Sequence, residues 1–463
     1  MFKNSFYYTF EKLSPKFISV LLLPVLLRLI KPELWAEITL LLALQLLFSY
    51  FLTQGDERSI LKFASNNEQL HKSFMSLIRY SFFGFIFIEV VGSLIKNLPF
   101  SIIYGLPFRF MYLSTVVISV NKLFLAKLRS LEKSPIILKS SFVESIFVNG
   151  FQLLLIVITV QIDGYDSRVI VTSYFAVQFL GNVIKFFYFV QKIKYNLFES
   201  FKYFLSKKPD EFLKFSNISF LILLSNYFLN WQDKFFVEYL FGLKQLGIYS
   251  VTTRVSNLGM VFISSILVAA YSKYWPSDLS TKVTKKVTHI TSEIIKISSL
   301  GLSSMMLIVV TVAVYIFPKS YEPSIFIIHY ACCLVFVQTI ILSLTIDLGR
   351  RNKLKKILYF NFSAFVSQFI IYFSISFTKL EEVFIIQIIT TLSFLLMFFR
   401  ESFLRMKISI FASFIILFFS AILVDFYIAN NSIFLQIFVF LLGVGLSVLT
   451  IYSWVNLDTE RTS

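Results

Sequence analysis

Apolar runs of about 20 residues recur from one end of this chain to the other, and a helix of that length crosses a hydrocarbon core of about 30 Å. A membrane admits only helices and closed barrels as spanning structures, because every backbone polar group must find its hydrogen bond within the protein. The chain is 57% hydrophobic and only 15% charged, whereas soluble domains carry roughly 25% charge. The sequence therefore predicts an all-α polytopic membrane protein with no separate soluble domain.

We predict fourteen transmembrane helices, at residues 16–31, 34–54, 80–98, 101–120, 141–160, 168–191, 212–231, 247–270, 292–317, 324–346, 357–378, 382–399, 408–428 and 432–454. If the N-terminus lies inside, every inner loop between spans carries more Lys and Arg than either outer loop beside it, as cytoplasmic loops do. Both termini are therefore expected in the cytoplasm. The net charge of +17 follows from this topology and faces anionic lipid headgroups, so we expect no nucleic-acid partner.

The spans form two similar sets, because spans two to six and spans eight to twelve begin at a nearly constant interval. A shift of six spans keeps the orientation, as in transporters built from parallel repeats. We therefore expect a six-helix lobe at 1–191, an amphipathic cytoplasmic linker at 192–211, a second six-helix lobe at 212–399, and two appended helices with a short cytoplasmic tail at 400–463.

The linker carries apolar side chains at helical spacing with lysines opposite, at Leu197, Phe198, Phe201 and Phe204. This pattern predicts a helix lying in the headgroup plane. A solvated loop is the alternative.

One segment carries a family resemblance. Residues 226–255 read NYFLNWQDKFFVEYLFGLKQLGIYSVTTRV and include Asp233, Gly247, Tyr249, Ser250 and Arg254. This segment resembles the start of the second half in bacterial polysaccharide and O-antigen flippases of the multidrug/oligosaccharidyl-lipid/polysaccharide exporter superfamily. RLIKPELWAEITLLLALQLL at 28–47 resembles the equivalent entry of the first half, but it has Trp-Ala-Glu where the family has a glycine and an aromatic residue. DLGRRNKLKKIL at 347–358 is similar to the family's small inner loop.

The resemblance implies two lobes around a central cavity that opens alternately to either side of the bacterial cytoplasmic membrane. The implied substrate is an undecaprenyl-pyrophosphate-linked oligosaccharide, a repeat unit of O-antigen (and so of lipopolysaccharide) or of capsule, moved from the inner to the outer leaflet. It implies no enzyme activity and no cofactor. A coupling ion, H⁺ or Na⁺, and polysaccharide polymerase machinery are the candidate small ligand and protein partner.

When the basic residues near the span ends are counted with the adjoining loops, four remain inside the predicted spans: Arg28, Arg109, Lys185 and Arg254. A charge within a membrane is unfavourable unless it is paired or hydrated, so each marks a candidate site. At about 1.5 Å per residue, Glu89 and Arg109 reach similar depths on consecutive spans. Structural ion pairing is therefore the alternative for Arg109, and likewise for Arg28 beside Glu37 and Lys185 beside Glu144. Glu89 is also the candidate ion-coupling residue.

Arg254 lies about 10 Å below the predicted outer face, and no acid of spans seven to nine is predicted at that depth. Polar stripes accompany it, formed by Asn226, Asn230 and Asp233 on span seven and by Tyr249, Thr253 and Ser256 on span eight. Such stripes face water or a polar substrate, or they hold helices together. An arginine fork in a hydrated cavity suits a pyrophosphate or a sugar carboxylate. The predicted substrate-binding residues are Arg254, Arg109, Arg28, Lys185, Tyr249, Asn226 and Asn230.

Two other functions remain open. A cation-coupled multidrug exporter of the same superfamily would be expected to have an acidic cavity, whereas bases outnumber acids within these spans. A membrane polysaccharide polymerase or glycosyltransferase needs outer loops that hold an acceptor, and the predicted outer loops are short. The sequence shows no metal-ligand spacing and no nucleotide-binding motif, so no catalytic or metal residues are predicted.

Overall fold

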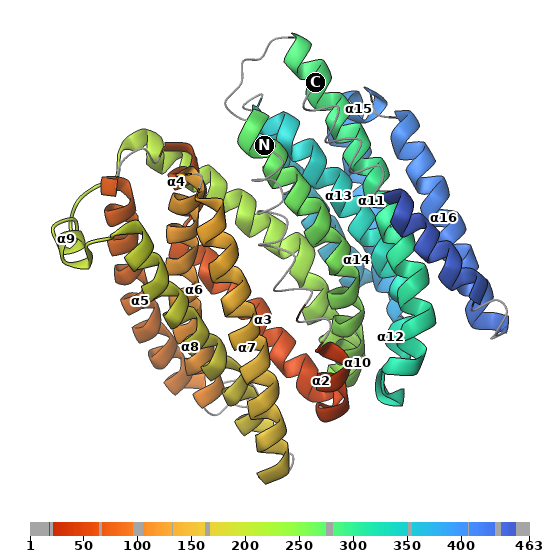
Figure 1. Ribbon diagram of the computed structural model, residues 1–463, viewed down its shortest axis with the longest axis horizontal. Helices are drawn as coiled ribbons and strands as arrows, with labels where there is room; N and C mark the ends of the chain where they lie inside the picture. The colour runs from red at the N-terminus through yellow and green to blue at the C-terminus, as the bar shows by residue number, and fades with distance from the viewer. Residues whose placement is uncertain are drawn as a thin grey trace. The chain divides into compact units, whose positions relative to one another are not determined.

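The computed structural model describes residues 18, 22–63, 67–95, 105–131, 133–162, 167–274, 281–350, 354–405, 407–430 and 437–450. Within these ranges the chain forms helices and short connections, with no β-strand (Figure 1). The prediction of an all-α fold is confirmed. The chain separates into two compact units. Unit 1 comprises residues 1–32 and 232–463, and unit 2 comprises residues 33–231.

Unit 2 is a bundle in which α6 packs against α5, α7 and α8, as Figure 1 shows. Its helices are α3 (Pro32–Thr53), α4 (Asp56–Phe63), α5 (Asn67–Ile95), α6 (Leu106–Ser130), α7 (Ser134–Ile162), α8 (Ser167–Ile193), α9 (Leu197–Phe201) and the first part of α10 (Asp210–Tyr274). Phe82, Phe83 and Phe87 on α5 are about two-thirds exposed, at 64–66%. Exposed aromatic side chains of this kind suit a surface that contacts lipid.

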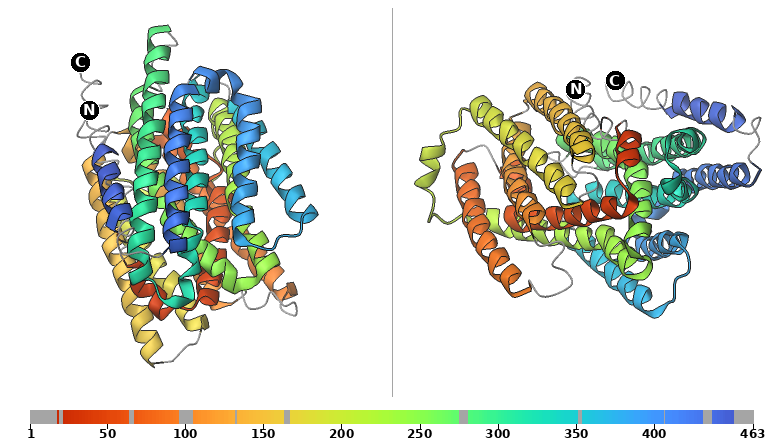
Figure 2. Two further views of the ribbon diagram at one scale, coloured as in Figure 1. Left: turned by 90° about the vertical axis from the view of Figure 1, so that its right-hand side faces the viewer. Right: turned by 90° about the horizontal axis from the view of Figure 1, so that it is seen from below.

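Unit 1 contains the rest of α10 and the C-terminal helices, with α11 packed against α13 and α16 (Figure 2). Its other elements are α2 (Leu23–Leu29), α11 (Thr281–Ile316), the 3₁₀ turn η2 (Lys319–Tyr321), α12 (Pro323–Phe326), α13 (Ile328–Arg350), α14 (Leu354–Ser374), α15 (Leu380–Arg405), α16 (Lys407–Asn430) and a helix over 437–450. The division into two six-helix lobes, a linker and appended helices stays a prediction.

Seven helices of the described ranges are long and apolar enough to cross a membrane, or eight if the bent pair Lys319–Ile325 and Ile328–Ile341 forms one span. The multi-span membrane character is confirmed, and the number fourteen stays a prediction. The starts of the first and last predicted spans fall outside the described residues.

The predicted outer loop between spans seven and eight is helical in the structure. α10 runs through residues 232–246, and its regular geometry breaks only at Gly242, where φ is 80° and ψ is 173°. Only glycine adopts such a backbone readily, because it has no Cβ. After this kink a second helix begins, and its segment LKQLGIYS buries an apolar face through Leu246, Ile248 and Tyr249.

The predicted amphipathic linker starts in the last residues of α8 and contains the short helix α9, and the rest of its apolar pattern lies in turns. Phe198 is 85% exposed and Leu205 is 82% exposed, whereas Ser200 on the opposite side of α9 is buried and accepts a hydrogen bond from, or donates one to, His71. The Ser200 side of α9 therefore packs against other residues of unit 2, whereas the Phe198 side is exposed. Its position in the headgroup plane stays a prediction.

Candidate functional site

The part of α10 that follows Gly242 is packed against the first residue of α3. A Cβ added at Gly247 would lie 2.0 Å from the carbonyl oxygen of Pro32, so only glycine permits this approach. The hydroxyl of Tyr321 donates a hydrogen bond to the Ile30 carbonyl at 3.0 Å. The glycine of the family-like segment is thus a packing residue that fixes the end of α2 within unit 1.

Arg28 lies in the last turn of α2, close to this packing contact. Its guanidinium donates to the backbone carbonyl of Ile316, at the end of α11, at 3.5 Å. The side chain is exposed in the structure. A carbonyl dipole leaves the formal charge of the guanidinium in place, so Arg28 keeps the ability to bind an anion.

A buried carboxylate lies beside the family-like tyrosine. The hydroxyl of Tyr249 donates a hydrogen bond to Asp233, and both side chains are almost wholly buried, at 0% and 3% exposure. The ammonium of Lys234 lies 3.6 Å from the other carboxylate oxygen. The Tyr249 ring also stacks on Phe384 at 4.6 Å between centroids. The predicted substrate-binding hydroxyl is thus engaged inside unit 1.

Arg254 follows Tyr249 by five residues on the same helix. It is half-buried, whereas its neighbours Thr253 and Ser256 are buried and donate their hydroxyls to backbone carbonyls of α10. The predicted stripe of span eight therefore faces the interior of unit 1. Asn257, one turn further round, is exposed. Arg254 lies between the buried and the exposed face of the helix.

Two predicted ion pairs are present in unit 2. Arg109 on α6 contacts Glu89 on α5 at 2.9 Å, with side chains 52% and 30% exposed. Lys185 on α8 contacts Glu144 on α7 at 2.5 Å, with side chains 12% and 22% exposed. The depth argument from the sequence is confirmed for both pairs. Both cations are held in these pairs, and their role in binding cargo stays a prediction.

The remaining predicted residues, Asn226 and Asn230, also belong to unit 2. The Asn230 amide donates to the Asn226 side-chain oxygen at 2.9 Å, and Asn226 is exposed. The candidate residues therefore divide between the units: Arg28, Tyr249 and Arg254 lie in unit 1, and Glu89, Arg109, Lys185, Asn226 and Asn230 in unit 2.

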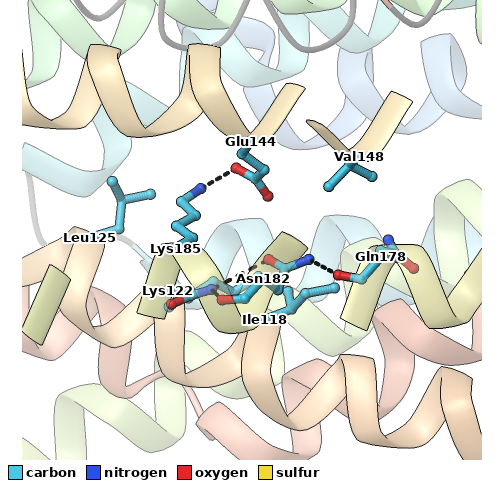
Figure 3. Close-up of a pocket in the computed structure, with 9 residues that line it drawn as sticks. Ile118, Lys122, Leu125, Glu144, Val148, Gln178, Asn182 and Lys185 are labelled. Atoms are coloured by element: carbon cyan, nitrogen blue, oxygen red, sulfur yellow. Dashed lines mark hydrogen bonds and ion pairs between the residues drawn. The ribbon is translucent and has the colours of Figure 1, made fainter. Parts of the chain in front are cut away.

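The Lys185–Glu144 pair borders a cavity of about 190 Å³ between α6, α7 and α8 (Figure 3). The cavity is lined by Ile118, Asn121, Lys122, Leu125, Glu144, Val148, Gln178, Asn182 and Lys185. The carboxamide side chains at the cavity form hydrogen-bonded pairs. Asn121 donates to Asn182, and the amides of Gln178 and Gln45 donate to each other. The sequence argument missed Lys122, which it assigned to an inner loop. The signal that was available is the neighbouring Asn121, a polar residue at the end of an apolar run.

No group of three or more His, Cys, Asp or Glu residues that would suit a metal ion occurs in the described ranges. His71 lies in unit 2 and His329 in unit 1. The side chain of His289 is outside the described residues.

Comparisons with known proteins agree on family and fold. The family described as "Polysaccharide biosynthesis protein" matches residues 1–271. No curated protein sequence matches the chain. A MOP superfamily transporter from Pyrococcus furiosus, described as having a binding pocket of reverse polarity, is 15% identical and superposes with a TM-score of 0.56 over 87% of this chain and 96% of its own.

Two structures of multidrug resistance MATE family transporters of the MOP superfamily are also similar. The outward-facing one gives 14% identity and a TM-score of 0.55, and the inward-facing one gives 13% and 0.53, each over 88% of this chain and 96% of its own. At this level of identity the comparison establishes the fold, and the resemblance drawn from the sequence is confirmed at that level.

Proposed function

Because this chain belongs to the polysaccharide biosynthesis protein family, we propose that it is a flippase for an undecaprenyl-pyrophosphate-linked oligosaccharide. The cargo moves from the inner to the outer leaflet of the bacterial cytoplasmic membrane by alternating access. Both termini are cytoplasmic in this proposal, and the repeat unit belongs to O-antigen or capsule. The transporter fold supports this role over that of a polymerase or glycosyltransferase.

The observation that carries the proposal is Arg254, a half-buried arginine on a helix whose neighbouring residues Thr253 and Ser256 are buried. The cargo's pyrophosphate and any sugar carboxylate are oxyanions, and a guanidinium binds such groups through two parallel hydrogen bonds. Arg28, with its formal charge directed at a backbone carbonyl, is the second cargo-binding residue of unit 1 in this proposal. An anionic cargo fits this chemistry better than the cationic drugs of a multidrug exporter.

The other candidates take supporting roles. Arg109 and Lys185 contact the cargo only in a state in which their pairs with Glu89 and Glu144 have opened. Tyr249, Asn226 and Asn230 supply hydroxyl and amide groups for sugar recognition. Glu89 releases or binds H⁺ or Na⁺ when its pair with Arg109 opens.

The test is polysaccharide export in a strain that lacks the native protein, with the amount of protein in the membrane measured alongside. Arg254→Gln is expected to abolish export at normal abundance, because the variant keeps a hydrogen-bonding side chain but loses the charge. Arg254→Lys should restore export only in part, since a lysine keeps the charge but lacks the planar fork.

Lys244→Gln is the matched control, because it removes one positive charge from an exposed position on the same helix. Normal export by Arg254→Gln at normal abundance would overturn the role of Arg254. Drug resistance that depends on the protein, without any effect on surface polysaccharide, would favour the multidrug exporter instead.

A further inference from the structure

The segment 196–206 carries apolar side chains that unit 2 leaves exposed. Phe198, Phe201 and Leu205 are 85%, 65% and 82% exposed. Their spacing of three and four residues is the spacing that places side chains on one side of helical turns. We call these three side chains the linker face. Single apolar residues on a surface need no partner, whereas a set that shares one side marks a surface that contacts lipid or another molecule.

Hydrogen bonds fix the backbone of this segment. The side-chain oxygen of Asn196 accepts from the backbone amides of Phe198 and Glu199 at 3.1 and 3.2 Å, and so caps the start of α9. Backbone hydrogen bonds between residues three apart continue the turns through residue 206. On the opposite side, Ser200 is buried and bonds His71 at 2.8 Å. The linker face therefore belongs to a folded segment that is attached to unit 2.

The same segment contacts α5 where the exposed aromatic surface of that helix begins. The guanidinium of Arg79 on α5 lies over the ring of Phe204, 5.6 Å from its centroid. Phe82 and Phe83 are 64% and 66% exposed. They follow Arg79 by three and four residues, so they lie on the same side of α5, one turn further along. Figure 1 shows α9 beside α5 at the edge of unit 2. The linker face is thus continuous with a surface that suits lipid.

Cations border the linker face. Four exposed lysines lie in this stretch of the chain: Lys192, Lys194, Lys202 and Lys207. The sequence has one acid between residues 192 and 208, Glu199, and its side chain is half-buried. Lys208 is engaged elsewhere, because its ammonium pairs with the buried carboxylate of Asp56. A lysine side chain can lie along an apolar surface with its ammonium among headgroups. This excess of exposed cations suits anionic phospholipids, which attract each lysine near the membrane surface.

We propose that the linker face anchors unit 2 in a leaflet that contains anionic phospholipid. Phe198, Phe201 and Leu205 insert at the level of the headgroups, and Lys202 and Lys207 bind the anionic headgroups. The position that the sequence predicts for this segment thereby gains defined contacts and a defined lipid partner. The anchor does not depend on the identity of the cargo or on Arg254.

The experiment measures contact between the linker face and lipid in nanodiscs, which leave both membrane surfaces accessible. The full-length protein carries an NBD fluorophore on the cysteine introduced by Leu205→Cys. The nanodiscs contain phosphatidylcholine alone or with an equal part of phosphatidylglycerol, and doxyl lipids quench a fluorophore that lies among lipid. We expect strong quenching with phosphatidylglycerol and about twofold weaker quenching without it, because the lysines then lose their anionic partners. Wild-type protein labelled in the same way gives the background of Cys332 and Cys333.

Lys133→Cys is the matched control for the label. Lys133 is an exposed residue of unit 2, and α6 reaches Ser130, about 15 Å past the end of its apolar run at residue 120. A label at this position should not be quenched by lipid. Equal quenching at the two positions, or equal quenching of the Leu205→Cys label in both lipids, would overturn the proposal. A Leu205→Cys label that is protected from iodide but not quenched by lipid would show that protein covers the linker face, and would also overturn it.

Charge variants test the assigned partner. Lys202→Gln in the labelled Leu205→Cys protein is expected to lower the ratio of inserted to exposed linker face about fivefold, because one lysine near an anionic surface contributes a factor of that size. Lys133→Gln removes the same charge from the control position and should leave the ratio unchanged. An unchanged ratio in Lys202→Gln, or an equal loss in Lys133→Gln, would contradict the role of the lysines.

A second measurement uses the wild-type protein and keeps the proposal testable if a labelled variant does not fold. Trypsin cleaves after exposed lysines, and cleavage after Lys133 gives the reference rate in the same sample. Relative to that rate, cleavage after Lys202 and Lys207 should be about fivefold slower in nanodiscs with phosphatidylglycerol than in phosphatidylcholine alone, since inserted lysines are shielded from the protease. Equal relative rates in the two lipids would overturn the proposal.

Discussion

The two compact units hold their intramembrane cations in different ways. In unit 2, Lys185 and Arg109 each contact a glutamate from a neighbouring helix. In unit 1, Arg28 contacts a backbone carbonyl, and Arg254 is half-buried at the edge of the buried face of α10. From the sequence, all four are charges inside predicted spans, and only Arg254 has no acid predicted at its depth.

A positive charge inside a span can therefore hold helices together or bind an anionic ligand. A paired charge in a membrane protein fastens helices together, and its removal leaves the partner stranded. An arginine that contacts a backbone carbonyl, as Arg28 does, keeps its formal charge for an incoming anion. The following predictions test whether the charges of unit 2 hold helices together while those of unit 1 bind the cargo.

The largest effect is expected for the more buried pair of unit 2. Lys185→Met or Glu144→Gln alone leaves an uncompensated charge, which is unfavourable by about 3–5 kcal/mol in buried settings, whereas the double change is close to neutral. We expect little folded protein for each single variant and recovery for the double variant, measured by size-exclusion chromatography of solubilised membranes. Single variants that are abundant but fail to export would show that unit 2 also binds cargo. That result would contradict the contrast between the two units.

A smaller effect is expected at Glu89 and Arg109, whose side chains are 30% and 52% exposed. A stranded charge at this more exposed pair is expected to be less unfavourable than the about 3–5 kcal/mol of a buried pair. Glu89→Gln and Arg109→Gln should each lower Tm by less than the Lys185 and Glu144 variants, and the double variant should lie close to wild type. If Glu89→Gln instead leaves Tm unchanged and abolishes transport, Glu89 is the coupling-ion residue and unit 2 has a charge with a direct role in transport.

The smallest effect is a pH dependence at His71, outside the predicted spans. His71 bonds Ser200 at 2.8 Å and stacks between Tyr195 and Tyr203. Burial lowers the pKa of His71, and the charge of Glu199 opposes this only in part. Unit 2 thus keeps this group neutral.

Because the folded state lowers this pKa, the unfolded state binds more protons as the pH falls below about 6.5. The docking of α9 is therefore complete above that pH and weakens as the pH falls toward the lowered value. Limited proteolysis of the turn after α9 should accelerate between about pH 7.5 and about pH 5. His71→Gln should remove the dependence. An identical dependence in that variant would contradict the assignment to His71.

The fold class and the two ion pairs of unit 2 were predictable from the sequence because a membrane restricts the possibilities. Length and apolarity determine which segments span, and a fixed rise per residue gives each charge a depth. Glu89 and Arg109 lie on consecutive helices, so equal depth implies contact. The same argument supported Lys185 and Glu144.

Contacts that depend on distant segments were not predictable. Lys122 was assigned to a loop because the apolar run ends at residue 120, but α6 continues to Ser130. Its partner Ser49 comes from α3, more than seventy residues earlier in the chain. The fully buried position of Tyr249 also depends on tertiary packing, since its ring contact with Phe384 joins α10 to α15. Spacing along one helix does not reveal which polar face is enclosed.

The segment 192–211 lies wholly inside unit 2, which continues to Trp231. A cut in this segment would therefore not separate the protein into its two units. The N-terminal fragment would lack residues 210–231 of α10, which pack within its own unit through contacts such as the ring pair Tyr50–Tyr227. It would also contain α2, which belongs to unit 1. Two co-expressed fragments could reassemble only by exchanging a helix in each direction, so neither is an independent half of the molecule.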